Sequence, residues 1–212
     1  MNEIIPVQLA VEDELSEVVL RAILRRSDRG YDVRRCFRPG GFGYLKKTIN
    51  GFNNAAKGIP FIVLTDLNAA ECAPALMKNW LRAPRHDNLM FRVAVKEVES
   101  WLIADRSALA RFLGIKQEIV PETPDELKDA KQTLIELARR CPNAKLRNAI
   151  VPRRGSTAKI GSDYNATLGR FVESRWDIKA AMEASPSLRR TFEAISRFTP
   201  KLEKNGAISG GE

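Results

Sequence analysis

The sequence predicts an α/β fold: a mostly parallel sheet flanked by helices, followed by a C-terminal helical extension. Two observations carry this prediction. Over the first half of the chain, segments with the apolar pattern of strands alternate with segments of helical periodicity, which is typical of a parallel sheet covered by helices on both faces. After about Gly114, the remaining patterned segments have helical periodicity only.

Four short segments are the predicted strands, and the first, third and fourth of them are mostly apolar. Each is rich in branched or aromatic side chains and stops at charged or turn-forming residues. They cover residues 4–11, 31–37, 59–66 and 89–95. The third, IPFIVLTD, is apolar nearly throughout, as expected of a strand buried on both faces.

A helical pattern follows each of these strands. The predicted helices cover residues 13–27, 44–56, 70–81 and 96–114. Gly30 stops the first, and Pro74 is tolerated in the first turn of the third. Gly51 interrupts the second, and the RPGGFG segment before it, residues 38–43, is predicted to be a turn.

The second half of the chain predicts helices alone, over residues 124–141, 162–176 and 185–198. Pro124 and the Ser185–Pro186 pair supply N-terminal signals for the first and the last of them. We therefore expect an α/β domain over residues 1–115, a helical extension packed on it over residues 116–200, and a flexible tail over residues 201–212.

Composition narrows the class of protein. Of 212 residues, 44% are hydrophobic and 29% are charged, the usual balance for a globular domain. No apolar run approaches the roughly 20 residues needed to span a bilayer, and the N-terminal segment carries an acid where a signal peptide carries Lys or Arg. We expect a cytoplasmic protein with no membrane association. Its net charge of +9 favours a polyanionic partner.

Polar and acidic residues follow three of the predicted strands. Glu12 follows the first, Asp66 and Asn68 the third, and Glu97 and Glu99 the fourth. Ligands of open parallel sheets bind outside the carboxyl ends of the strands, and oxygen ligands suit a hard cation such as Mg²⁺. Two such ions can assist phosphodiester cleavage. Acids just after strands also cap helices, so a purely structural role stays open.

Several motifs resemble the Toprim-type domain of the 4276 family of domains of unknown function. The resemblance covers most of the chain, and its most specific part is E-x-E-x-W. The motifs are V-E-D at 11–13, T-D-L-N at 65–68, A-E-C-A-P at 70–74, E-V-E-S-W-L-I-A-D at 97–105, G-S-D-Y-N at 161–165 and S-P-S-L-R-R at 185–190.

This resemblance implies the Toprim fold, a Rossmann-like fold shared by topoisomerases, primases and OLD-type nucleases, in which a glutamate and a D-x-D pair hold magnesium. Glu12 matches that glutamate and Asp66 the first aspartate of D-x-D. Glu97, Glu99 and Asp105 match acids typical of this particular family. Its members are often encoded beside an ABC- or AAA-type ATPase, frequently in loci that resist phage.

The sequence departs from the family pattern at two positions. Asn68 stands where D-x-D has its second aspartate, and its uncharged amide should hold a metal less tightly. Asp13 replaces the small residue that often follows the glutamate. Either Glu71 or the Glu97/Glu99 pair could complete the site.

Positive charge is clustered in two stretches without acids, residues 33–65 and 137–162. Nucleic-acid phosphates favour such donors. The residues predicted to contact nucleic acid are Arg153, Arg154, Lys159, Arg35 and Arg38. A merely solvated basic surface is the alternative.

The leading hypothesis is a nuclease that depends on Mg²⁺ or Mn²⁺, the effector subunit of an ATPase-associated phage-defence system. Its predicted catalytic residues are Glu12, Asp66, Glu97 and Glu99, and its predicted metal ligands are Glu12, Asp66, Asn68 and Glu99. One alternative is a Toprim-shaped adaptor without catalysis that binds nucleic acid or the ATPase. Another is an enzyme of small nucleotides. The choice between DNA and RNA, and a homo-oligomeric state, stay open.

Overall fold

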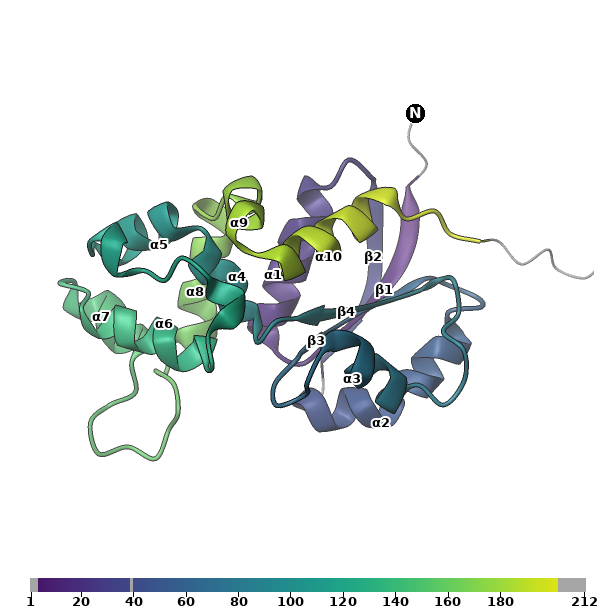
Figure 1. The fold of residues 1–212 in the computed structure, drawn as a ribbon, viewed down its shortest axis with the longest axis horizontal. Coiled ribbons are helices and arrows are strands. Elements are labelled where there is room, and N and C mark those ends of the chain that lie inside the picture. The colour runs from purple at the N-terminus through teal and green to yellow at the C-terminus, as the bar shows by residue number, and fades with distance from the viewer. Residues whose placement is uncertain (1–3, 39, 202–212) are drawn as a thin grey trace, which may run out of the picture.

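The computed structural model describes residues 4–38 and 40–201 (Figure 1). It has a four-stranded, all-parallel sheet in the order β2-β1-β3-β4, flanked by helices, which confirms the predicted α/β class and is consistent with a Rossmann-like fold. The strands are β1 (Ile5–Val11), β2 (Tyr31–Phe37), β3 (Phe61–Asp66) and β4 (Leu89–Ala94). Each lies within the segment predicted for it.

Two layers of helices cover the sheet. On one face lie α1 (Glu14–Arg26) and α10 (Pro186–Arg197), and on the other lie α2 (Gly41–Ala55) and α3 (Ala73–Trp80). β3 is buried along its whole length because Phe61 and Val63 face α2 and α3 while Ile62 and Leu64 face α1. The chain passes from β1 to β2 on one side and to β3 on the other. In such sheets the reversal opens a crevice at the carboxyl ends of the two central strands.

The start of α2 differs from the prediction. The helix begins at Gly41, inside the segment predicted to be a turn, and continues through Gly51. Gly40 precedes it with φ 107°, a left-handed conformation that glycine adopts without strain. Leu45 and Ile49 pack beneath the sheet, so tertiary burial outweighs the low helix propensity of the glycines.

The helix predicted over residues 96–114 is two helices, α4 (Val98–Ala104) and α5 (Arg106–Leu113). Asp105 separates them. Its Oδ1 accepts a hydrogen bond from the Ala108 N–H (3.1 Å), and its Oδ2 accepts one from the Asp177 N–H (2.8 Å). This buried carboxylate therefore begins α5 and ties it to α9 (Ile178–Ala184), which the sequence pattern did not reveal.

The helical extension also departs from prediction at its start. Short 3₁₀ turns cover Gln117–Ile119 and Pro124–Glu126, and α6 (Ala130–Arg139) begins only after Asp129, which caps it. α7 (Ala144–Ile150) was not predicted, whereas α8 (Tyr164–Ser174) and α10 were. Figure 1 shows α5, α6, α7 and α8 grouped beyond the carboxyl ends of the strands, with α10 returning along β4.

One hydrophobic core joins the sheet to the helical extension. It runs from β1 and α1 through α4 to α6, α8 and α9. Trp101 and Trp176 are buried in it; the Trp101 indole donates to Ser187 Oγ (2.7 Å) and the Trp176 indole to the Trp101 carbonyl (3.1 Å). Packing thus crosses the predicted domain boundary near residue 115.

The chain is still ordered at Lys201, where a flexible tail was predicted to begin. The Lys201 N–H donates to Asn88 Oδ1 (2.7 Å), and its ammonium pairs with Asp87 (2.6 Å). The rest of the predicted tail, residues 202–212, lies outside the described residues. Within the described part of the chain, no helix has the length and apolarity that crossing a membrane requires.

Candidate metal centre

Asp66 is the last residue of β3, and its side chain is buried. Its Oδ1 accepts a hydrogen bond from the Val98 N–H (3.0 Å) at the start of α4. Its own N–H donates to Glu12 Oε1 (2.8 Å) just beyond β1. Asp66 therefore links the ends of two neighbouring strands to the helix that follows β4.

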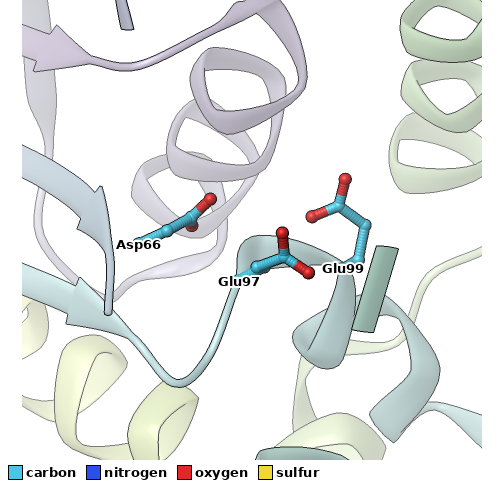
Figure 2. Close-up of side chains that lie close together, drawn as sticks. All are labelled: Asp66, Glu97 and Glu99. Carbon is cyan, nitrogen blue, oxygen red and sulfur yellow. The ribbon is translucent and has the colours of Figure 1, made fainter. Parts of the chain in front are cut away.

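Three carboxylates converge at this point (Figure 2). Asp66 comes from β3, while Glu97 and Glu99 come from the beginning of α4. Each offers one oxygen, and these three oxygens lie within 4.8 Å of one another. Asp66 and Glu99 are buried, and Glu97 is partly exposed. This arrangement could hold a metal ion.

Glu99 is the most enclosed of the three, with a relative exposure of 0%. Its Oε1 accepts a hydrogen bond from the Tyr164 hydroxyl of α8 (2.9 Å). Its Oε2 is buried and has no hydrogen-bond partner within the described residues. A buried carboxylate oxygen without a partner is costly, and a cation would satisfy it. The donor set therefore fits a hard divalent ion.

Lys131 of α6 is the cation nearest to the carboxylates. Its N–H donates to Glu97 Oε2 (2.8 Å), and its Nζ lies 3.5 Å from Glu99 Oε1 and 4.0 Å from Glu97 Oε1. Burial lowers the pKa of this lysine, whereas the neighbouring acids raise it. The effect of the acids is larger, so the pKa is raised. Lys131 therefore stays charged and neutralises part of the cluster.

Burial and repulsion between acids raise the pKa values of two of these carboxyl groups, Asp66 and Glu99. Burial raises the pKa of Asp66 well above its usual range, and the charges of Glu99 and Glu12 raise it further. Burial likewise raises the pKa of Glu99 to about 7, although Lys131 opposes the shift. Without a further cation, burial and repulsion therefore disfavour the ionised forms of Asp66 and Glu99, and a bound divalent cation would favour them.

Glu12 lies beside the three carboxylates. Its Oε1 accepts hydrogen bonds from the Thr65 hydroxyl and from the Asp66 N–H. Burial raises its pKa, and these two bonds oppose the shift. The capping role considered for acids after strand one belongs to Asp13, which accepts from the N–H (2.8 Å) and hydroxyl (2.7 Å) of Ser16.

Three other predicted or considered residues lie elsewhere. Asn68 is exposed, and its amide donates to the Asp66 carbonyl (3.3 Å). Glu71 is exposed and lines a cavity between α3 and α10. Asp105 caps α5 as described above. Of the predicted metal ligands, the structure groups Asp66 and Glu99 with Glu97, and Glu12 lies next to this group, with bonds to Thr65 and the Asp66 N–H.

The predicted nucleic-acid contacts fall on two separate elements. Arg153 and Arg154 line a cavity of about 680 Å³ beside α7, together with Arg139, Lys145 and Arg147, and Lys159 is exposed in the same α7–α8 loop. The Arg35 guanidinium lies 4.5 Å from the centre of the Phe37 ring on β2. Arg38 pairs with Glu17 of α1 (3.3 Å). The α7–α8 loop is therefore the denser basic surface of the two.

Sequence reasoning missed two residues of the centre. Tyr164 lies within G-S-D-Y-N, so that motif pointed to the right segment without revealing the contact with Glu99. Lys131 lies in an ordinary amphipathic helix, and no local pattern distinguishes it. Both reach the carboxylates only through the packing of α6 and α8.

No protein-family model, curated protein or solved structure matches the chain. The fold and the site define an α/β protein with a buried carboxylate cluster at the carboxyl edge of its sheet. The resemblance to the Toprim-type family stays a prediction.

Proposed function

We propose that the chain is a metal-dependent Toprim-type nuclease, with Mg²⁺ or Mn²⁺ held by Asp66, Glu97 and Glu99. The observation that carries the proposal is the buried, unpartnered Oε2 of Glu99 beside two further carboxylates. Carboxylate oxygens are the ligands these hard ions prefer. The location supports it too, since ligands of such sheets bind where the strand order reverses.

The surrounding residues support phosphodiester chemistry. A bound divalent ion would supply electrostatic stabilisation of charge on a phosphate oxygen. Tyr164 and Lys131 orient Glu99 through its Oε1. Glu12 is fixed by Thr65 and the Asp66 N–H, and burial raises the pKa of its carboxyl, which suits a group that takes up and releases a proton during the reaction.

Nucleic acid is the proposed substrate because the protein is strongly basic. Its net charge is +9, although the site itself is acidic. Arg153 and Arg154 stand on the α7–α8 loop with three further cations around one cavity. Cations in such numbers favour contacts to phosphates. On the resemblance alone, we further propose an ABC- or AAA-type ATPase as partner and phage defence as the setting.

Metal binding is the first test. Titration calorimetry with Mn²⁺ and Mg²⁺ should show a saturable site in the wild type, and Glu99→Gln or Asp66→Asn should weaken it at least tenfold. Glu71→Gln, an exposed carboxylate outside the cluster, is the matched control and should bind as the wild type does. Equal affinity in all four proteins would rule out this centre.

Cleavage is the second test. Single-stranded DNA, duplex DNA and transfer RNA are incubated with the protein and Mn²⁺, with and without a candidate ATPase. Cleavage of at least one substrate, lost in Glu99→Gln and retained in Glu71→Gln, is the expected result. Intact polynucleotides under every condition would contradict a nuclease, and hydrolysis of nucleotides alone would indicate a small-nucleotide enzyme.

A second function, a non-catalytic adaptor, is favoured by one observation. Lys131 Nζ lies 3.5 Å from Glu99 Oε1, so the protein already supplies a cation to the carboxylates. An adaptor would bind nucleic acid or the ATPase equally well with and without divalent ions. Absence of any saturable metal site, with nucleic-acid binding intact, would select this function.

A further inference from the structure

β4 lies at an edge of the sheet, and its two sides can be told apart. The Asn88 and Ala94 carbonyls accept hydrogen bonds from the N–H groups of Phe61 and Leu67. In a parallel pair, alternate residues use both backbone groups toward one neighbour. The even-numbered residues of β4 therefore face β3, and the odd-numbered ones face outward.

Both ends of this outer edge are closed by other parts of the chain. Arg85 donates to the Leu89 carbonyl at one end, and the Val95 N–H donates to Ser187 Oγ (3.4 Å) at the other. Between them, the outward N–H and C=O groups of Phe91 and Val93 have no hydrogen-bond partner within the described residues. Phe91 and Val93 are only 2% and 7% exposed, so a partner would have to enter the cavity that they line in order to pair with these groups. Within such a cavity, an edge strand with free backbone groups is a template for another strand.

A cavity of about 480 Å³ runs along this edge. Its walls include Met77 of α3 on one side and Arg190 of α10 on the other, and Figure 1 shows β4 lying between these two helices. Phe91 and Val93 line the cavity, and their side chains pack toward α3. Arg92 also lines it, from the opposite face of the strand, where Met90 and Ala94 are buried. Because residues of both faces line it, the cavity straddles the edge of the strand.

The charge of this groove is positive. Arg92 is largely enclosed; burial lowers its pKa, and the positive charges of Arg85 and Arg190 lower it further. Its Nε lies 3.5 Å from Thr191 Oγ1, and it has no carboxylate partner within the described residues. Among the residues that the structure describes, Glu71 is the one acid that lines the cavity. The groove therefore favours an acidic occupant.

We propose that the outer edge of β4 docks an extended, acidic segment of a partner protein as a fifth strand. The segment would pair with the backbone groups of Phe91 and Val93. Successive side chains of a strand point to opposite faces. The acidic side chains of the docked segment would therefore lie on the face of Arg92 and Arg190, and its apolar side chains would pack beside Met77 on the other face. A small anion could neutralise the arginines, but it would leave the two backbone pairs without partners.

Nuclear magnetic resonance tests this proposal with a defined probe, a blocked pentapeptide of sequence VEVEV. At millimolar peptide the Phe91 and Val93 amide signals should shift, and their hydrogen exchange should slow at least tenfold. The same peptide N-methylated at its pairing amides, and a VKVKV peptide, should leave both signals unchanged. Equal effects of the methylated peptide, or no shift at these two amides, would overturn the proposal.

Charge is tested separately on exposed residues of α10. Arg190→Met should weaken VEVEV binding by about fivefold, the scale of an exposed ion pair. Arg197→Met, on the same helix but outside the cavity, should not change it. Equal affinity of both variants would contradict an acidic occupant. Protection of the two amides that rises with protein concentration, without peptide, would assign the edge to a second copy of the chain and overturn the proposal.

Discussion

The stability of the folded protein and the affinity of the proposed metal site both depend on one residue, Glu99. It is fully buried, yet only its Oε1 is satisfied, by Tyr164 and Lys131. A carboxylate in this position costs stability whenever it is ionised, and it recovers that cost when a cation is bound. The same feature that carries the proposed function therefore predicts a measurable effect of pH on folding.

Without divalent ions, the wild type should become less stable than Glu99→Gln as the pH rises. Burial raises the pKa of Glu99 from 4.5 to about 7, so the folded protein keeps a proton that the unfolded chain releases within this window. The relative loss from pH 5 to pH 8 should be on the order of 2–3 kcal/mol. Urea unfolding at each pH measures it, with Glu71→Gln following the wild type. Parallel curves for the wild type and Glu99→Gln would show that Glu99 ionises normally.

The Lys131→Met variant tests what happens when the positive charge beside the carboxylates is removed. Without its ammonium, the metal-free protein should lose on the order of 1–2 kcal/mol at pH 8, because the buried carboxylates lose their counter-charge. Mn²⁺ should bind more tightly, because it no longer competes with Nζ, which lies 3.5 Å from Glu99. Urea unfolding and calorimetry measure the two effects. Lys128→Met, on an exposed residue before α6, should change neither. A weaker Mn²⁺ site in Lys131→Met would mean that the lysine supports the metal rather than replaces it.

At the scale of elements, the turn before α8 depends on a close backbone approach. A Cβ at Gly161 would lie 2.2 Å from the Ala149 carbonyl oxygen, and the Gly161 N–H donates to the Ile150 carbonyl (2.9 Å). No side chain fits there without moving the backbone of α7. Tyr164, which reaches Glu99, follows three residues later.

Gly161→Ala should therefore destabilise the protein by about 1–3 kcal/mol and weaken Mn²⁺ binding through Tyr164. Gly51→Ala is the matched control: it lies within α2 with nothing inside 4 Å of its added Cβ. That change should stabilise by about 0.5–1 kcal/mol, because alanine favours the helix. Thermal unfolding and calorimetry check both. An unaltered melting temperature in Gly161→Ala would show that the turn relaxes easily.

Elements that depend on their own local sequence were predicted more accurately than elements that depend on contacts with distant parts of the chain. β3 and β4 were predictable because burial on both faces leaves a nearly continuous apolar pattern. The break at Asp105 was not, because part of its cause is a distant contact: one carboxylate oxygen caps α5, and the other accepts from the Asp177 N–H at the start of α9. α7 is short and half exposed, so it lacks a clear apolar stripe.

The candidate site follows the same rule. Asp66, Glu97 and Glu99 were predictable because parallel strands bring their carboxyl ends to one edge. Glu12 was assigned to the right neighbourhood, although its bonds to Thr65 and Asp66 support the cluster. Lys131 was not predictable, since its position depends on how α6 packs beside α4.

At the scale of the whole molecule, positive charge on the α7–α8 loop should govern binding to nucleic acid. The Arg153→Ala/Arg154→Ala variant should bind a labelled oligonucleotide more weakly, and the slope of log affinity against log salt should fall by about two. Fluorescence anisotropy at several salt concentrations measures both. Lys57→Ala/Lys116→Ala, which removes the same charge from other surfaces, should keep the wild-type slope. An equal loss in both variants would indicate a general effect of net charge.

The carboxylates and their counter-charge come from different halves of the chain. Asp66, Glu97 and Glu99 precede residue 115, whereas Lys131 and Tyr164 follow it. A polypeptide ending near residue 115 would keep the acids but lose both groups that restrain Glu99. By reciprocity of linked equilibria, if Tyr164 strengthens ion binding through Glu99, a bound ion must equally strengthen the contact of α8 with Glu99. Conversely, any partner that pulls α8 outward would weaken the proposed ion site, because Glu99 would lose the Tyr164 hydroxyl.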